Sequence, residues 1–112
     1  MDCIFCKIVA GDIPAKKIRE DGELLAFFDI DPKAPTHILV IPKKHIASLA
    51  HAQPGDAPLL GHLLEAAAAI AREQGLVQGY RVVISTGPHG GQTVDHLHVH
   101  LLGGRQMHWP PG

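Results

Sequence analysis

The stretch Asp95-His96-Leu97-His98-Val99-His100-Leu101-Leu102, which Gly103-Gly104 ends, decides the fold. Histidines and apolar residues alternate in it with period two, which is the repeat of a β-strand. The three histidines then share one face of the strand, with successive imidazoles about 7 Å apart, and Leu97, Val99 and Leu101 share the other. We expect the apolar face to pack on a helix, and the histidine face to look onto water, a ligand or a metal.

Three histidines on one face permit two kinds of site. Zinc accepts imidazole ligands, but the outer two positions lie about 14 Å apart along a strand, too far for both to bind one ion through bonds of about 2 Å. At most two adjacent histidines could share an ion, and only if the strand bends. In an organic site the middle imidazole, His98, is a nucleophile and its neighbours donate hydrogen bonds. An anionic phosphate suits the second kind, because Gly90-Gly91 just upstream lets main-chain N–H groups approach its oxygens.

The rest of the chain predicts an α+β fold. An apolar stripe predicts one long helix that begins after Asp56 and ends at Gly75. A short helix over residues 3–10, capped by Asp2, precedes it. Strands are expected over residues 16–20, 24–29, 37–41, 80–86 and 95–102, with a glycine-rich loop over 87–93. Short connections pair strands antiparallel, so we expect a sheet of about five antiparallel strands covered by helix.

Composition limits the function classes. The chain has 112 residues, 46% of them hydrophobic, which is enough for a single domain over residues 1–112. A net charge of −1 and a pI near 6.7 leave no electrostatic footprint for nucleic acid or an anionic membrane. No apolar run approaches the roughly 18 residues of a membrane span, and no signal peptide is visible. We therefore expect a cytoplasmic protein that binds neither nucleic acid nor membrane.

Cys3 and Cys6 form a C-x-x-C pair. Without an export signal, a structural disulfide is not expected. The pair is then half of a zinc site, a redox pair or two buried thiols. A redox pair would follow a strand in a βαβ unit, and no strand precedes Cys3, which disfavours that interpretation.

The whole chain resembles the histidine triad (HIT) superfamily, first through His-Leu-His-Val-His-Leu-Leu followed by Gly-Gly-Arg. Further segments resemble its histidine triad nucleotide-binding (Hint) branch, namely residues 4–8, 13–16, 26–27, 29–30, 34–37, 40–46, 90–92 and 103–112. The tail over 105–112 separates that branch from the dinucleoside polyphosphate hydrolases. The resemblance implies a HIT-like fold whose sheet extends across a homodimer.

The resemblance also implies a mechanism. His98 matches the nucleophile that attacks the α-phosphate of a nucleotide derivative. A nucleotidyl-histidine intermediate forms, and water releases the nucleoside monophosphate. His96 and His100 match the flanking positions that hold phosphate oxygens and assist the leaving group, and His37 matches a further histidine beside the nucleophile.

The implied nucleotide contacts lie in several segments. Asp29 matches the acid that grips the ribose hydroxyls, while Gly91 and Thr93 match loop positions at the phosphate. Ser85 stands where the branch usually carries asparagine; its hydroxyl can still donate, at shorter reach. Trp109 matches a tail residue that approaches the partner subunit's site. The apolar slot for the purine ring matches Phe5, Ile8, Ile13, Phe27, Ile30 and Leu39.

Zinc is the one metal that the resemblance implies. Other members of the superfamily carry the C-x-x-C and bind zinc with a histidine of the Lys-x-His-Ile segment and the first triad histidine. Here those residues are Cys3, Cys6, His45 and His96, and two thiolates with two imidazoles suit tetrahedral zinc. Catalysis itself requires no cofactor. Four further histidines have no assigned role and are expected at the surface: His51, His62, His89 and His108.

These features favour a purine nucleoside phosphoramidase, which cleaves P–N bonds of nucleoside phosphoramidates. A dinucleoside polyphosphate hydrolase or a nucleotidyl transferase is an alternative that the short tail after the triad, with Trp109, disfavours. A purine-nucleotide-binding module without turnover is the other alternative, and an intact His98 argues against it. Asp95, where an aromatic residue is common in the branch, alters the charge beside His96.

Overall fold

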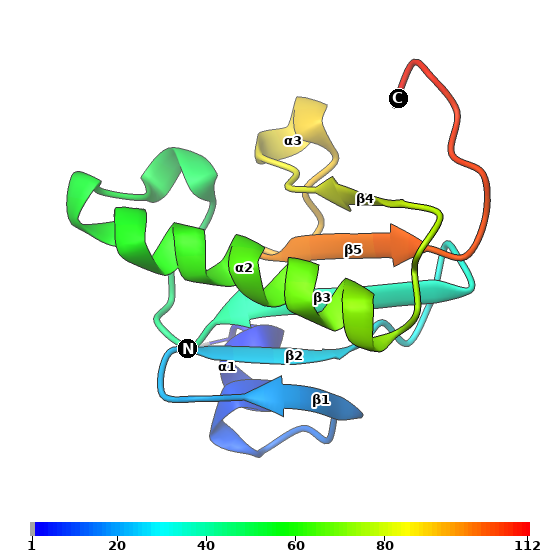
Figure 1. Ribbon diagram of the computed structural model, residues 1–112. Helices are drawn as coiled ribbons and strands as arrows, with labels where there is room; N and C mark the ends of the chain where they lie inside the picture. The colour runs from blue at the N-terminus through cyan, green and yellow to red at the C-terminus, as the bar shows by residue number, and fades with distance from the viewer. Residues whose placement is uncertain (1) are drawn as a thin grey trace.

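The computed structural model describes residues 2–112; Met1, the first residue of the expected domain, lies outside the described part. Five strands form one antiparallel sheet, as expected, and the structure arranges them in the order β1-β2-β3-β5-β4 (Figure 1). Their bounds are Lys17–Glu20 (β1), Leu24–Phe28 (β2), Thr36–Pro42 (β3), Tyr80–Val83 (β4) and Val99–Gly103 (β5). The order brings β5, which contains His100 and directly follows His98, between β3 and β4.

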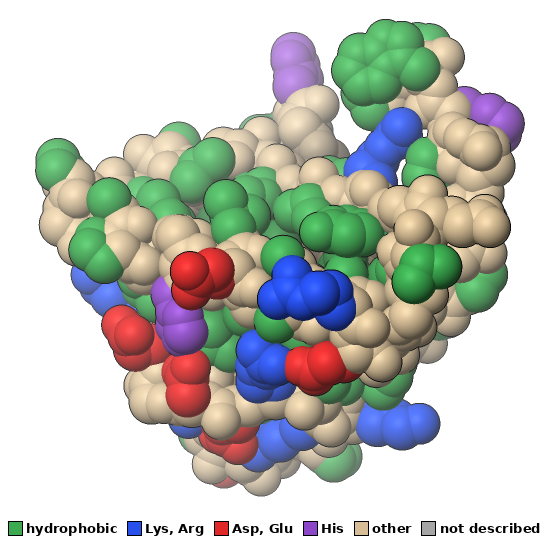
Figure 2. All heavy atoms as spheres, viewed as in Figure 1, with side chains coloured by type: hydrophobic (Ala, Val, Ile, Leu, Met, Phe, Trp, Pro, Cys, Tyr) green, Lys and Arg blue, Asp and Glu red, His purple; other side chains and the backbone are tan. Residues whose placement is uncertain are grey.

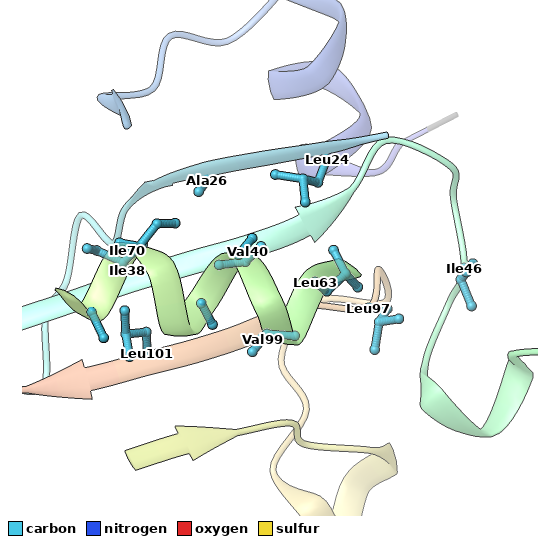
Figure 3. Packing of buried hydrophobic residues seen from close by; sticks show 13 residues of the cluster. Leu24, Ala26, Ile38, Val40, Ile46, Leu63, Ile70, Leu97, Val99 and Leu101 are labelled. Atoms are coloured by element: carbon cyan, nitrogen blue, oxygen red, sulfur yellow. The ribbon is translucent and has the colours of Figure 1, made fainter. Parts of the chain in front are cut away.

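The long helix α2, Ala57–Glu73, crosses one face of the sheet, as Figure 1 shows. Its buried side chains meet alternate residues of the strands, among them Ile38 and Val40 of β3 (Figure 3). Leu97, Val99 and Leu101 belong to the same core, so the apolar side of the histidine stretch packs on the helix as expected. Burial of such apolar surface contributes about 25 cal/mol per Å² to the free energy of unfolding.

The opposite face of the sheet carries the short helix α1, Ile4–Ala10. Phe5 and Ile8 of α1 pack there with Phe27 and Leu39, the alternate residues of the same strands. Because successive side chains of a strand point to opposite faces, each of β2 and β3 serves both cores. Residue 37 follows the parity of Leu39, which puts His37 on the α1 face.

Two helix caps differ from the expectation. The N-cap of α1 is Cys3, whose Sγ accepts the N–H of Cys6, and not Asp2. Asp56 stands at the start of α2, but its carboxylate makes no cap bond to that helix. It instead accepts the N–H of Gln53 and closes the 3₁₀ turn Pro54–Asp56 (η2), which follows another 3₁₀ turn, Leu49–His51 (η1).

The histidine stretch is strand only in its second half, because β5 begins at Val99. β4 likewise ends at Val83 and not at Thr86. The glycine-rich segment contains one helical turn, α3 (Gly87–Gly90), which ends at Gly91 with φ of 80°. In residues 2–112, none of the helices has the length and apolar character needed to cross a bilayer.

Candidate active site and metal centre

A cleft of about 690 Å³ opens on the α1 face of the sheet. Most of the residues that the resemblance assigns to the nucleotide line it: Phe5, Ile8, Ile13, Phe27, Asp29, Ile30, Leu39, Ser85, Gly91 and Thr93, together with His37, His98 and His100. The structure therefore brings together residues that lie up to 95 positions apart, from Phe5 to His100. Ile30 lines the rim and is 97% exposed.

Strand register explains why the cleft forms. Phe27 pairs with Leu39, Leu39 with His100, and His100 with Val83, so these four side chains form one row across the sheet. In the next row, His37 pairs with Leu102 and Leu102 with Arg81. Directly paired residues of antiparallel strands share a face. The register thus places two imidazoles between an apolar slot and the glycine-rich loop.

His98 has its ring oriented by the main chain. Its Nδ1 lies 2.7 Å from the carbonyl oxygen of His96, and a carbonyl only accepts, so His98 Nδ1 carries the proton and donates it. In the neutral ring, Nε2 then keeps its lone pair. Phe5 lies edge-on to the ring, with centroids 5.1 Å apart, and the side chain is 5% exposed. A lone pair held at a fixed position beside a cleft is what a nucleophile needs.

His37 and His100 form a second chain of hydrogen bonds. The N–H of Lys33 donates to His37 Nδ1 at 3.0 Å. A proton on the neutral His37 ring therefore sits on Nε2, which lies 2.9 Å from His100 Nδ1 and donates to it. The proton of neutral His100 is then on Nε2. That N–H can donate to a phosphate oxygen.

Burial keeps these rings neutral. It lowers the pKa of His37, against the opposing effect of Asp29, whose Oδ2 lies 3.5 Å from His37 Nε2. Burial, reinforced by His98 and His37, lowers the pKa of His100 to about 4. The tautomers set by the hydrogen bonds therefore persist at neutral pH. The rings of His98 and His100 are 4.8 Å apart, closer than the 7 Å expected from strand spacing, because His98 precedes the strand and turns toward its own main chain.

Two residues assigned to the site lie outside the cleft lining. His96 is fully buried and turns its ring away, toward the N-terminal cysteines. Trp109 is 82% exposed in the C-terminal tail, and Figure 2 shows hydrophobic side chains at that projecting end of the chain. Within one chain, Trp109 therefore does not line the cleft.

A four-residue cluster joins α1 to the sheet: Cys3, Cys6, His45 and His96, whose ligand atoms all lie within 4.8 Å of one another. Three sulfur–nitrogen distances are 3.2, 3.3 and 3.6 Å, and the two Nδ1 atoms lie 3.2 Å apart. Zn–S bonds of about 2.3 Å and Zn–N bonds of about 2.05 Å in a tetrahedron give edges of about 3.5 Å for S···N and about 3.3 Å for N···N. The donor set and its spacing therefore fit tetrahedral zinc.

The surroundings of the cluster also suit a metal. His96 Nε2 donates to the carbonyl oxygen of Pro42 at 2.8 Å, which leaves the Nδ1 lone pair directed at the cluster. Such an outer hydrogen bond fixes the tautomer and orientation of a ligating histidine. His96 therefore contributes its side chain to this centre and its carbonyl to His98.

The remaining histidines are mostly at the surface. His51, His89 and His108 are exposed, as expected, whereas His62 is half-buried on α2. Asp21 lies in the turn between β1 and β2, and its Oδ2 is 2.7 Å from His62 Nε2. This contact raises the pKa of His62.

Comparison with known proteins agrees with the geometry. Residues 10–107 match the sequence model of the HIT domain. The chain belongs to the HIT family.

Three relatives show how far this HIT protein resembles characterised and solved members. A HIT family hydrolase from Legionella pneumophila superposes with a TM-score of 0.97 at 53% identity, covering 99% of this chain and 100% of that one. A histidine triad nucleotide-binding protein from Candida albicans gives 0.83 at 35% identity, over 97% and 83% of the chains. A 14 kDa zinc-binding protein from Zea mays is 54% identical over 97% of this chain and 87% of its own.

The HIT cleft also contains residues that sequence reasoning missed. Arg81, Leu102, Arg105 and Met107 line it beyond the triad, and Lys33 lines it beside His37. Leu102 and Arg81 could have been found from the alternation of β5 and from its pairing with β4. Lys33 and Arg105 belong to loops, where no periodic signal marks which side chains converge.

Proposed function

We propose that this HIT protein is a purine nucleoside phosphoramidase: a hydrolase that releases a nucleoside monophosphate through a nucleotidyl-histidine intermediate. The observation that carries the proposal is the tautomer of His98, whose Nδ1–H is tied to the carbonyl oxygen of His96 so that Nε2 is a free lone pair beside the cleft. The named activities of the relatives, a hydrolase and a nucleotide-binding protein, support the same class.

The first step uses that lone pair. His98 Nε2 attacks the α-phosphorus, a new N–P bond forms, and the P–N bond to the leaving amine breaks. The amine takes up a proton from solvent, which the proton released in the second step replaces. The phosphoryl oxygens carry the negative charge of this step. His100 Nε2–H and the main-chain N–H groups around Gly91 are the donors available to stabilise it.

The second step regenerates the enzyme. Water attacks the phosphorus, the N–P bond to His98 breaks, and the electron pair returns to Nε2. The hydroxyl group of the water stays on phosphorus, and the other proton of the water is released. The net reaction therefore adds one water across the P–N bond. The chemistry needs no metal, because the nucleophile is the neutral imidazole itself.

The cleft offers contacts for the rest of a nucleotide. Phe5 and Phe27 meet edge to face at 5.7 Å between ring centroids, and with Leu39 they bound an apolar slot of purine-like character. The Asp29 carboxylate lies at the cleft with one oxygen accepting the N–H of Asp31, which fixes its orientation. A fixed carboxylate beside an apolar slot suits a ribose diol next to a base. Ser85 adds a hydroxyl donor for the phosphate, and Thr93 adds another.

The metal centre is proposed as structural. One zinc ion held by Cys3, Cys6, His45 and His96 would fasten α1, which carries Phe5, to the sheet. The ion would supply folding energy and no part of the reaction.

We also propose a homodimer. β4 is an edge strand, and its Tyr80 and Val82 are exposed, as is Trp109 in the tail. Edge strands with apolar side chains are ready templates for pairing with another chain. Pairing of two β4 strands would extend the sheet across the dimer and bring each tail toward the other subunit.

A substrate panel tests the proposed activity. Adenosine and guanosine phosphoramidates, diadenosine polyphosphates and nucleotidyl sugars would be incubated with the purified protein, and monophosphate release measured. We expect turnover to be fastest with the phosphoramidates. Preferential cleavage of diadenosine polyphosphates would identify the alternative hydrolase, and binding of AMP without turnover of any substrate would identify a binding module.

A further inference from the structure

The C-terminal segment after β5 is hydrogen-bonded to the loop that precedes β3. Arg105 donates from Nε and Nη2 to the carbonyl oxygen of Lys33, at 3.2 and 3.1 Å. Next to it, Gly104 has φ of 90° and runs so close to Pro35 that an added Cβ would stand 2.9 Å from Pro35 Cβ. Two independent contacts thus hold residues 33–35 against the end of β5.

Lys33, whose carbonyl oxygen binds Arg105, also fixes the tautomer of His37 in the cleft. Lys33 accepts from Arg105 with its carbonyl and donates with its N–H to His37 Nδ1, at 3.0 Å. His37 in turn donates from Nε2 to His100 Nδ1, at 2.9 Å. Arg105 is therefore linked to His100 by three consecutive hydrogen-bonded contacts, although Arg105 and Lys33 are 72 residues apart.

The direction of this chain has a chemical consequence. If the N–H of Lys33 moved away, His37 Nδ1 would lose its donor, and the His37 proton could occupy either nitrogen. With the proton on His37 Nδ1, Nε2 could no longer donate to His100, and His100 would have to place its own proton on Nδ1. The Nε2–H of His100, which the reaction uses toward the phosphate, would then be lost.

We propose that Arg105 is a positioning residue: through the main chain of Lys33 it holds the tautomers of His37 and His100 that the nucleotidyl transfer requires. The inference rests on the proposed function for its catalytic consequence and on geometry alone for the tautomers. Arg105 makes no described ion pair within residues 2–112, and its hydrogen bonds in that part of the chain go to carbonyl oxygens of Lys33 and Gln106. Two of its guanidinium N–H groups donate to the same main-chain carbonyl oxygen.

The first readout is spectroscopic. In wild-type protein, long-range ¹H–¹⁵N spectra of the histidine rings are expected to show unprotonated Nδ1 in both His37 and His100. In Arg105→Ala, both rings are expected to shift toward a mixture of tautomers. Arg105 is exposed, so the truncation leaves both cores intact. Arg19→Ala is the matched control, because Arg19 pairs with Glu73 far from the cleft and its loss should leave both spectra unchanged.

The second readout separates turnover from binding. Arg105→Ala is expected to lower kcat about tenfold, as misplacement of a catalytic group does, while the Kd for AMP stays within about twofold. Arg105 lines the cleft, but its guanidinium is engaged by the carbonyl oxygens of Lys33 and Gln106. Asp29 keeps its own bonds to Asp31 and to the main chain of His37, so affinity should survive. Arg105→Lys retains a donor for the carbonyl and is expected to recover part of the turnover.

The outcomes separate this inference from the proposed function. Unchanged tautomers in Arg105→Ala would overturn the inference, whatever the activity. Parallel losses of kcat, AMP affinity and melting temperature would also overturn it, since they would indicate a general structural role. A wild-type protein that binds AMP but turns over no substrate would refute the proposed function, and the ring spectra would still test the link from Arg105 to His100.

Discussion

The Nδ1 nitrogen of His98 lies 2.7 Å from the carbonyl oxygen of His96, and the side chain of His96 belongs to the cysteine–histidine cluster. One residue therefore serves two sites, with its ring in the candidate metal centre and its carbonyl on the candidate nucleophile. The N–H of Leu97, which donates to the Ile46 carbonyl at 2.7 Å, fixes the same peptide from the other side. The divided role of His96 explains why the triad is not three equivalent side chains around a phosphate.

Replacement of His98 by alanine should abolish phosphoramidate hydrolysis. The nucleophile acts only in the chemical step, whereas binding draws on the apolar slot, Asp29 and the loop amides. We expect AMP affinity within about tenfold of wild type, or about 1.4 kcal/mol, by calorimetry. Retention of full activity in His98→Ala would refute the mechanism. His89→Ala, at an exposed position on α3, is the matched control and should retain full activity.

The metal centre predicts about one zinc per chain in protein purified without chelator, measured by elemental analysis. Cys3→Ser should lose the metal while keeping the helix cap, because serine is a good N-cap residue. A loss of about 1–2 kcal/mol would lower the melting temperature by roughly 5–15 °C. Wild-type protein from which a chelator has removed the zinc should melt near the same temperature as the variant. If the protein contains no zinc and Cys3→Ser melts like wild type, the cysteines are ordinary packing residues.

The proposed dimer should be visible by light scattering at micromolar concentration, with a mass near 24 kDa, which is twice the 12.0 kDa of one chain. Val82→Glu places a charge on the β4 edge and should shift the mass toward that of one chain. Leu49→Glu is the matched control, since Leu49 is a similarly exposed apolar residue on η1, outside the sheet. A wild-type mass near that of one chain would exclude the dimer.

His100 predicts a loss of stability in acid. Its folded pKa is about 4, below the ordinary 6.5, so between those values the unfolded chain binds more protons than the folded one. The stability that neutral His100 allows is fully present above pH 6.5 and declines as the pH falls toward 4. Urea unfolding of wild type and His100→Gln at pH 7.5 and 5 measures this. The variant should lose less stability between the two pH values.

His62 should respond in the opposite direction. Its hydrogen bond with Asp21 raises its pKa, so the stability it contributes is fully present below its unfolded pKa and is lost as the pH rises through the folded value. Ring titration by NMR checks both histidines in one experiment. His62 should titrate above 6.5 and His100 well below it. Titration of both near 6.5 would contradict the two environments described.

The sequence alone was sufficient wherever the signal is local. Alternation in residues 95–102 predicted which side chains pack on the helix, and the apolar stripe predicted α2, because periodicity reflects burial directly. It failed at positions where a tertiary contact replaces a local one. Asp2 was expected to cap α1, but the Sγ of Cys3, a member of the cysteine–histidine cluster, takes that position. The strand was expected to include His96, but it begins only at Val99. The buried ring of His96 instead contacts the sulfur atoms of Cys3 and Cys6.

The sequence by itself determined the five-stranded sheet, its helical cover and most of the residues that line the cleft. Only the tertiary structure decided which ring nitrogen carries the proton in His37, His96, His98 and His100. Those tautomers depend on the main-chain groups of Lys33, Pro42 and His96 in a particular geometry. It alone also decided that Cys3 meets His96 across 93 residues and that Arg105 meets Lys33 across 72. Hydrogen bonds are short and directional, so they follow from where the sheet order carries each segment and from no pattern along the chain.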